Sequence, residues 1–131
     1  MPNQQRASIL LAHGSSDARW RAPFGQLLEQ IRQGLDGGAA RLELAYMELA
    51  EPSLADQIRA LAADGVSHID VLPLFFAAGR HLRKDVPAIL TALQAELASE
   101  GHNISLQLHS PVGLEPEVAA AISQVVLRQL S

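Results

Sequence analysis

The chain has 131 residues, of which 48% are hydrophobic, and its formal net charge is -4 at pH 7. That length suits one compact domain with a core of its own, so we expect residues 1–131 to form a single lobe. Cysteine is absent, which excludes disulfides, thiolate metal sites and cysteine nucleophiles and leaves histidine and carboxylate side chains as metal ligands. The negative net charge argues against a surface that binds nucleic acid. No apolar run approaches the roughly 20 residues that a membrane span requires. We therefore expect a cytoplasmic protein.

Four short apolar runs alternate along the chain with four longer segments of helical periodicity. The expected strands span 7–13, 41–47, 67–76 and 104–109, and the expected helices span 17–35, 53–65, 83–99 and 116–130. Because parallel strands need right-handed crossovers, this order predicts an α/β fold: a four-stranded parallel sheet with helices on both faces, in a three-layer sandwich. Such a sheet most often has the strand order 2-1-3-4, which leaves a ligand crevice beyond the carboxyl ends of the first and third strands.

The first expected helix carries an apolar stripe on one face. Its members are Phe24, Leu27, Leu28, Ile31 and Leu35. The stretch "GLDGG" is expected to end this helix. Trp20 and Phe24 are expected in the core, with an apolar wall for a flat ligand as the alternative. Ser15 and Ser16 do not fit the G-x-S-x-G pattern of serine hydrolases, so we interpret them as caps of this helix.

Three potential metal ligands follow the expected strands at one edge of the sheet. His13 ends the first strand, Glu48 follows the second, and His81 lies in the loop "AAGRHLRKD" after the third. Two imidazoles and a carboxylate make an open site for Co(II), Ni(II), Fe(II) or Zn(II), with positions free for a substrate. A single histidine at a strand end is more often a satisfied surface or core residue. Two histidines at the crevice favour a metal site.

The other histidines are weaker candidates. His68 opens the third strand at the opposite edge and His102 lies in a turn, so we expect both to be solvent-exposed. His109 ends the fourth strand on the same edge as His13, but that strand is remote from the crevice.

Basic side chains gather after the first and third strands. Five of the ten Lys and Arg residues lie there: Arg19, Arg21, Arg80, Arg83 and Lys84. Guanidinium groups pair with carboxylates, so this cluster favours an acidic ligand, and a solvated helix start is the alternative. Cations at a helix N-terminus oppose the helix dipole, which argues for another reason for their presence. The P-loop pattern G-x-x-x-x-G-K-[ST] is absent, so we expect no nucleotide cofactor.

Three blocks of the sequence resemble a known family. "LLAHGSSDARWRAPF", "LAYMELAEPSL" and "VLPLFFAAGRHLRKDVP" are similar to the signature blocks of the short-form sirohydrochlorin cobaltochelatases of the CbiX type, and the likeness extends through "SPVGLEPEV". That family is related to siroheme ferrochelatases and nickel chelatases. The resemblance implies a single chelatase-like lobe that inserts a divalent metal into sirohydrochlorin, a planar tetrapyrrole polycarboxylate. Co(II) is the favoured metal substrate, with Ni(II) or Fe(II) as alternatives.

The resemblance also implies roles for individual residues. His13 and His81 are the metal-binding and catalytic histidines, and Glu48 is the carboxylate, with Glu51 as its competitor. On the chemistry of the side chains, rather than by the resemblance, we expect Arg19, Arg80, Arg83 and Lys84 to bind the carboxylates of the substrate, with Ser15 as a further substrate-binding residue. Single-lobe members of the family pair, so the resemblance implies a homodimer.

Two other functions fit parts of this pattern. Histidine phosphatases also place a catalytic histidine after a first strand, but Arg precedes that histidine, whereas Ala12 precedes His13 here. A non-catalytic module that binds metal or a tetrapyrrole would use the same ligands without accelerating insertion.

Overall fold

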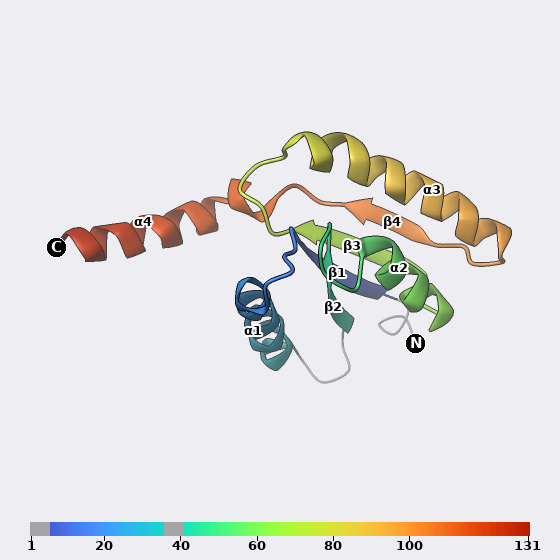
Figure 1. Cartoon of the computed structure of the whole chain (residues 1–131), viewed down its shortest axis with the longest axis horizontal. Coiled ribbons are helices and arrows are strands. Elements are labelled where there is room, and N and C mark those ends of the chain that lie inside the picture. The colour runs from blue at the N-terminus through green and yellow to red at the C-terminus, as the bar shows by residue number, and fades with distance from the viewer. Residues whose placement is uncertain (1–5, 36–40) are drawn as a thin grey trace.

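The computed structural model describes residues 6–35 and 41–131, except for the side chain of His81 (Figure 1). Four parallel strands form one sheet: β1 (Arg6–Ala12), β2 (Arg41–Tyr46), β3 (His68–Pro73) and β4 (Ser105–Leu108). Their order, β2-β1-β3-β4, confirms the prediction. Most of "GLDGG" lies outside the described residues. No helix in the described ranges is long and apolar enough to cross a membrane.

The helices lie close to their predicted ranges: α1 (Ala18–Gly34), α2 (Leu54–Ala63), α3 (Val86–Ser99) and α4 (Pro116–Leu130). The prediction that α3 starts at Arg83 is wrong, because His81–Asp85 form a π-helical turn, η2, before the α-helix begins. Pro87 explains this. A proline ring clashes with the carbonyl four residues earlier, here that of Arg83, so a regular α-helix cannot extend back through this position.

The core lies between the sheet and one helical layer. Alternate residues of β1 and β3 point to the same face, and Ile9, Leu11, Ile69 and Val71 are fully buried there. They pack with buried apolar residues of α2 and α3: Leu54, Ile58, Leu61, Ala62, Val86, Leu90, Leu93 and Leu97. The strands are therefore anchored mainly from this side.

The opposite face is packed less tightly. Figure 1 shows α1 on the other side of the sheet from α3. The predicted stripe of α1 is half-buried, but Leu35 is exposed and no residue of the helix is fully buried. The expectation that Trp20 belongs to the core is wrong, because its side chain is 71% exposed.

On this second face, three basic side chains lie around the carboxylate of Asp70. His109 Nε2 donates a hydrogen bond to Asp70 Oδ1 at 2.8 Å, His68 Nε2 lies 3.4 Å from the same oxygen, and Arg6 Nη2 lies 3.6 Å from Oδ2. Burial alone raises the pKa of Asp70, but the hydrogen bond from His109 and the charge of His68 outweigh it and hold that pKa below its usual value. His68 and His102 are half-buried, so the expectation that they are solvent-exposed is wrong.

Candidate metal centre

His13 and Glu48 meet at the carboxyl edge of the sheet. Two backbone hydrogen bonds continue the pairing of β1 and β2 past the strand ends, from Met47 N to Ala12 O at 2.9 Å and from Glu48 N to His13 O at 3.1 Å. This register places Glu48 Oε1 3.2 Å from His13 Nε2. The two side chains are 56% and 64% exposed, so an ion from solvent can reach both. Two of the three predicted ligands therefore converge.

Gly14 makes this approach possible. Its φ is 102°, a left-handed conformation that side chains rarely tolerate. A Cβ at this position would lie 1.8 Å from the backbone oxygen of Glu48. The glycine after His13 therefore lets the segment that follows β2 lie directly against the segment that follows β1.

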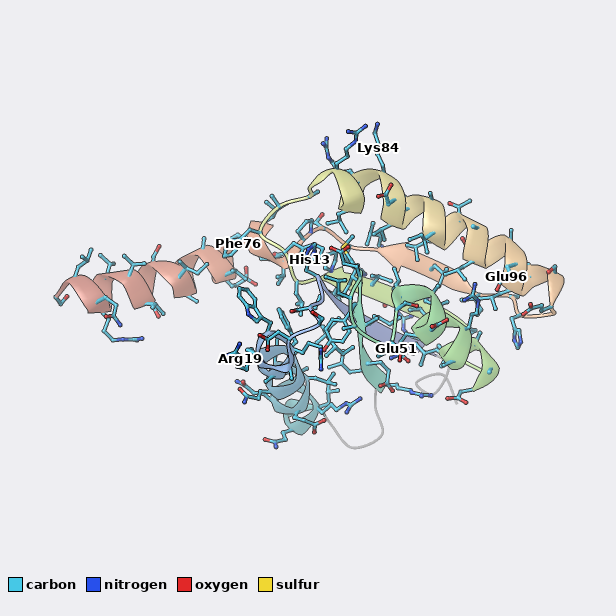
Figure 2. The ribbon with its side chains drawn as sticks, in the orientation of Figure 1. His13, Arg19, Glu51, Phe76, Lys84 and Glu96 are labelled. Atoms are coloured by element: carbon cyan, nitrogen blue, oxygen red, sulfur yellow. The ribbon has the colours of Figure 1, made fainter. Side chains whose placement is uncertain are left out.

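The backbone after Glu48 is strained. Leu49 has a φ of 61° and a 67% exposed side chain, and a left-handed conformation costs a residue with a Cβ about 1–2 kcal/mol. Such strain is typical of functional sites. Glu51, which precedes a cis peptide bond to Pro52, is exposed and lies apart from His13, toward α2 (Figure 2). Of the two competing carboxylates, Glu48 is the one beside His13.

The turn between His13 and α1 is held by its own polar side chains. Asp17, not Ser15 or Ser16, is the helix N-cap, and it accepts a hydrogen bond from Arg19 N at 2.9 Å. The prediction that the serines cap the helix is therefore wrong. Ser15 Oγ instead accepts from Asp17 N at 3.0 Å, and Arg21 Nη1 donates to Ser15 O at 2.9 Å. Serine and aspartate cap helices about equally well, so the path of the turn, which brings Asp17 to the first N–H groups of the helix, decides between them.

The basic residues proposed for substrate binding do not lie together. Arg19 donates to both carboxylate oxygens of Asp17 through Nε and Nη2 at 3.2 and 2.9 Å, which lowers the pKa of Asp17. Arg80 lines a cavity beside His13. Lys84 projects from the outer side of η2, apart from His13 (Figure 2). Only Arg80, among these three, adjoins the metal edge directly.

Two small cavities flank His13. One, of about 230 Å³, is lined by Glu48, Ser53, Asp85 and Ile89 among others. The other, of about 220 Å³, is lined by Met47, Phe75, Ala77, Gly79, Arg80 and Leu82 as well as His13. The backbone of His81 directly follows Arg80 at the start of η2, so this loop reaches the edge that His13 occupies. Among the described side chains, which exclude that of His81, no three histidines or carboxylates are grouped closely enough to hold a metal ion.

Phe75 is a site residue that sequence reasoning missed. Its ring meets the His13 ring edge to face, with centroids 6.2 Å apart and an interplanar angle of 74°. A short 3-10 helix, η3 (Val112–Leu114), holds the loop that carries Phe75, because Gly113 N donates to Phe75 O at 2.8 Å. A Cβ on Gly113 would lie 2.3 Å from Phe76 Cα. The sequence did hold a signal for this residue, because the apolar run of the third strand continues through "PLFF", past the end of β3.

Known proteins resemble the chain over most of its length. The CbiX family profile matches residues 7–129. A sirohydrochlorin cobaltochelatase of Sulfurisphaera tokodaii is 27% identical over 118 residues, which cover 90% of this chain and 88% of the relative. A sirohydrochlorin cobaltochelatase of Methanopyrus kandleri is 34% identical over 87 residues, 64% of this chain and 57% of that relative.

Solved structures share the fold. A cobalamin biosynthesis CbiX protein from Marinobacter aquaeolei superposes with a TM-score of 0.80 at 45% identity and covers 95% of this chain and 97% of its own. The sirohydrochlorin chelatase SirB from Bacillus subtilis subspecies spizizenii, solved in complex with cobalt, gives a TM-score of 0.74 at 26% identity. The match covers 92% of this chain but 49% of SirB, so the chain corresponds to about half of that protein.

Proposed function

The chain belongs to the CbiX family, and from that premise we propose a sirohydrochlorin chelatase whose metal centre is built from His13, Glu48 and His81. Its curated relatives are sirohydrochlorin cobaltochelatases, so the reaction is the insertion of a divalent metal into a tetrapyrrole. Co(II) is the favoured substrate ion, and imidazole and carboxylate ligands accept Ni(II) and Fe(II) as well. The observation that carries the metal centre is the 3.2 Å approach of Glu48 to His13.

The geometry of this pair suits a transiently held ion. Two ligand atoms about 2.1 Å from a tetrahedral ion are separated by about 3.4 Å, close to the observed distance between Nε2 and Oε1. Both side chains are more than half exposed, so the ion is neither enclosed nor desolvated by the protein. A site with few protein ligands and open access binds the metal weakly enough to release it.

The same side chains can accept the protons that the macrocycle loses when the metal enters it. Insertion of a divalent metal displaces two protons from the pyrrole nitrogens of the macrocycle. As the ion leaves the protein, the His13 nitrogen and the Glu48 carboxylate regain the lone pairs that held it. Those lone pairs lie beside the macrocycle and accept the protons, so the ligands become general bases in the same step.

Arg80, Arg83 and Lys84 bind the peripheral carboxylates of the macrocycle in this proposal. Replacing Arg83 or Lys84 with Ala is expected to raise KM by about fivefold for an exposed ion pair, with kcat unchanged, because these contacts are similar before and after insertion. Steady-state kinetics measure both constants. Arg59→Ala removes the same charge from α2, where Arg59 pairs with Glu96 at 2.8 Å, and should leave KM unaltered. A fall in kcat at saturating substrate contradicts the role in binding.

We also propose that two cytoplasmic copies act together. Sirohydrochlorin is broad compared with the edge of a four-stranded sheet, and each copy supplies one such edge. The two-to-one length ratio between SirB and this chain supports the same arrangement.

The decisive test uses the purified protein with sirohydrochlorin and Co(II). A chelatase accelerates the change in the visible spectrum of the macrocycle above the spontaneous rate, with multiple turnovers per protein. A carrier or tetrapyrrole-binding module gives binding without acceleration, and that result contradicts the proposal. Parallel assays with Ni(II) and Fe(II) rank the substrate ions.

A further inference from the structure

Exposed apolar side chains gather at the carboxyl edge of the sheet. Outside α4, the described residues hold four large apolar side chains that are at least 61% exposed, and each of them follows a different strand. They are Trp20 in the first turn of α1, Leu49 between β2 and α2, Phe76 between β3 and η2, and Leu114 in η3. Because the carboxyl ends of parallel strands lie at one edge, all four lie on the side of the sheet that carries His13. Apolar surface of this kind around a polar site indicates a ligand with an apolar part.

Leu49 is the member of this group that is least expected on physical grounds. Its φ of 61° is left-handed, whereas the other described residues with a positive φ are glycines. Glycine and asparagine adopt this conformation readily, and either would also avoid leaving a large apolar side chain in water. Leucine is unfavourable on both counts in the free protein. A contact that the free protein lacks would compensate for both, and Leu49 directly follows Glu48.

The apolar part of the proposed substrate is the face of its ring. Its carboxylates lie at the periphery, whereas the pyrrole nitrogens that receive the metal lie at the centre. An ion held between His13 Nε2 and Glu48 Oε1, which are 3.2 Å apart, therefore enters through a face of the macrocycle. A side chain beside Glu48 meets that face and not the charged rim. The strand order β2-β1-β3 places Leu49 and Phe76 on opposite sides of His13, so apolar side chains flank the point of metal transfer.

We propose that Leu49 contacts the face of the macrocycle and positions its centre over the ion held by His13 and Glu48. This role rests on the proposed function, because it takes sirohydrochlorin as the ligand. The segment that carries Leu49 is held against the segment after β1 by the hydrogen bond from Glu48 N to His13 O at 3.1 Å. The leucine therefore keeps its place relative to the metal ligands, which a residue that positions a substrate requires.

Binding of sirohydrochlorin without metal tests this contact apart from the insertion reaction. Leu49→Asn removes the apolar side chain but tolerates the left-handed backbone, so it should match the wild type in thermal stability and in Co(II) affinity. Its affinity for sirohydrochlorin, measured by equilibrium dialysis, should fall about tenfold, because contact of a leucine side chain with an apolar surface contributes roughly that much. Leu49→Met keeps an apolar side chain and should retain the affinity. Leu35→Asn makes the same change at the far end of α1 and should leave the affinity unaltered.

Several outcomes would overturn the role of Leu49. Wild-type affinity for sirohydrochlorin in Leu49→Asn shows that the side chain does not contact the macrocycle. Weakening by Leu49→Met or by Leu35→Asn as strong as that by Leu49→Asn shows that an apolar side chain at this position has no special part in binding. A loss of thermal stability in Leu49→Asn assigns the side chain to the fold, and a change in mass by light scattering assigns it to a contact with a second copy.

The proposed function is judged separately on the same samples. A wild type that binds sirohydrochlorin but does not accelerate Co(II) insertion contradicts the chelatase function and leaves the variants to judge Leu49. A wild type that inserts Co(II), together with a Leu49→Asn variant of unchanged affinity for sirohydrochlorin, contradicts only the role of Leu49.

Discussion

Replacing His13 with Ala is expected to weaken Co(II) binding strongly and to abolish most metal insertion. The change removes the imidazole that lies 3.2 Å from Glu48 and with it one of the ligands that fix the geometry of the ion. Loss of a hydrogen-bonding partner around a metal typically costs 10- to 100-fold in affinity, so loss of a ligand should cost at least about 100-fold. Isothermal titration of Co(II) and the insertion rate measure the two effects, and His81→Ala should behave in the same way.

The controls for this prediction distinguish a ligand from a base. His102→Ala removes an imidazole from the turn after α3 and should preserve Co(II) affinity. A histidine that acts only as a proton acceptor would leave metal affinity intact in its Ala variant while slowing the chemical step. Wild-type Co(II) affinity in His13→Ala would therefore remove that residue from the metal centre.

The second large effect is expected for Gly14→Ala. Its new methyl group would lie 1.8 Å from the backbone oxygen of Glu48, and its φ of 102° is unfavourable for alanine. The segment after β2 must move away, which should lower the free energy of unfolding by about 2 kcal/mol or more and separate Glu48 from His13. Thermal unfolding and Co(II) titration measure the two consequences on one sample.

Gly25→Ala is the matched control. This glycine lies within α1, and a Cβ built there meets nothing within 4 Å. Alanine is the better helix former by about 1 kcal/mol, so this variant should be as stable as the wild type or more stable, with the same affinity for Co(II). If Gly14→Ala also kept wild-type stability and metal affinity, the close approach of the two segments would not be needed for the site.

The sequence predicted the sheet well because its signals are local and strong. Parallel strands buried on both sides give short apolar runs, and the crossover rule then restricts the possible topologies. The parallel order of the strands also predicted that His13 and Glu48 lie close together, because the carboxyl ends of neighbouring parallel strands lie at one edge of the sheet. Their meeting needed no knowledge of side-chain packing.

The remaining features depend on contacts between distant segments. Asp70 and His109 are 39 residues apart, and their hydrogen bond follows from the register of β3 and β4, which apolar periodicity does not specify. Asp17 and Ser15 both suit a helix start, and only the path of the turn decides between them. An amphipathic pattern predicted α4 correctly as a helix, but such a pattern does not say which surface covers its apolar side.

The unequal packing of the two sheet faces has a consequence for how the molecule opens. Free energies of local opening follow the number of buried apolar contacts, so β1, β3, α2 and α3 should behave as one cooperative unit that opens only on global unfolding. The α1 side, with no fully buried residue in its helix, should open at lower cost. His13 follows a strand of the stable unit, whereas the turn that carries Ser15 and Arg19 leads into the less stable one. The imidazole of His13 should therefore keep its place when the α1 side opens.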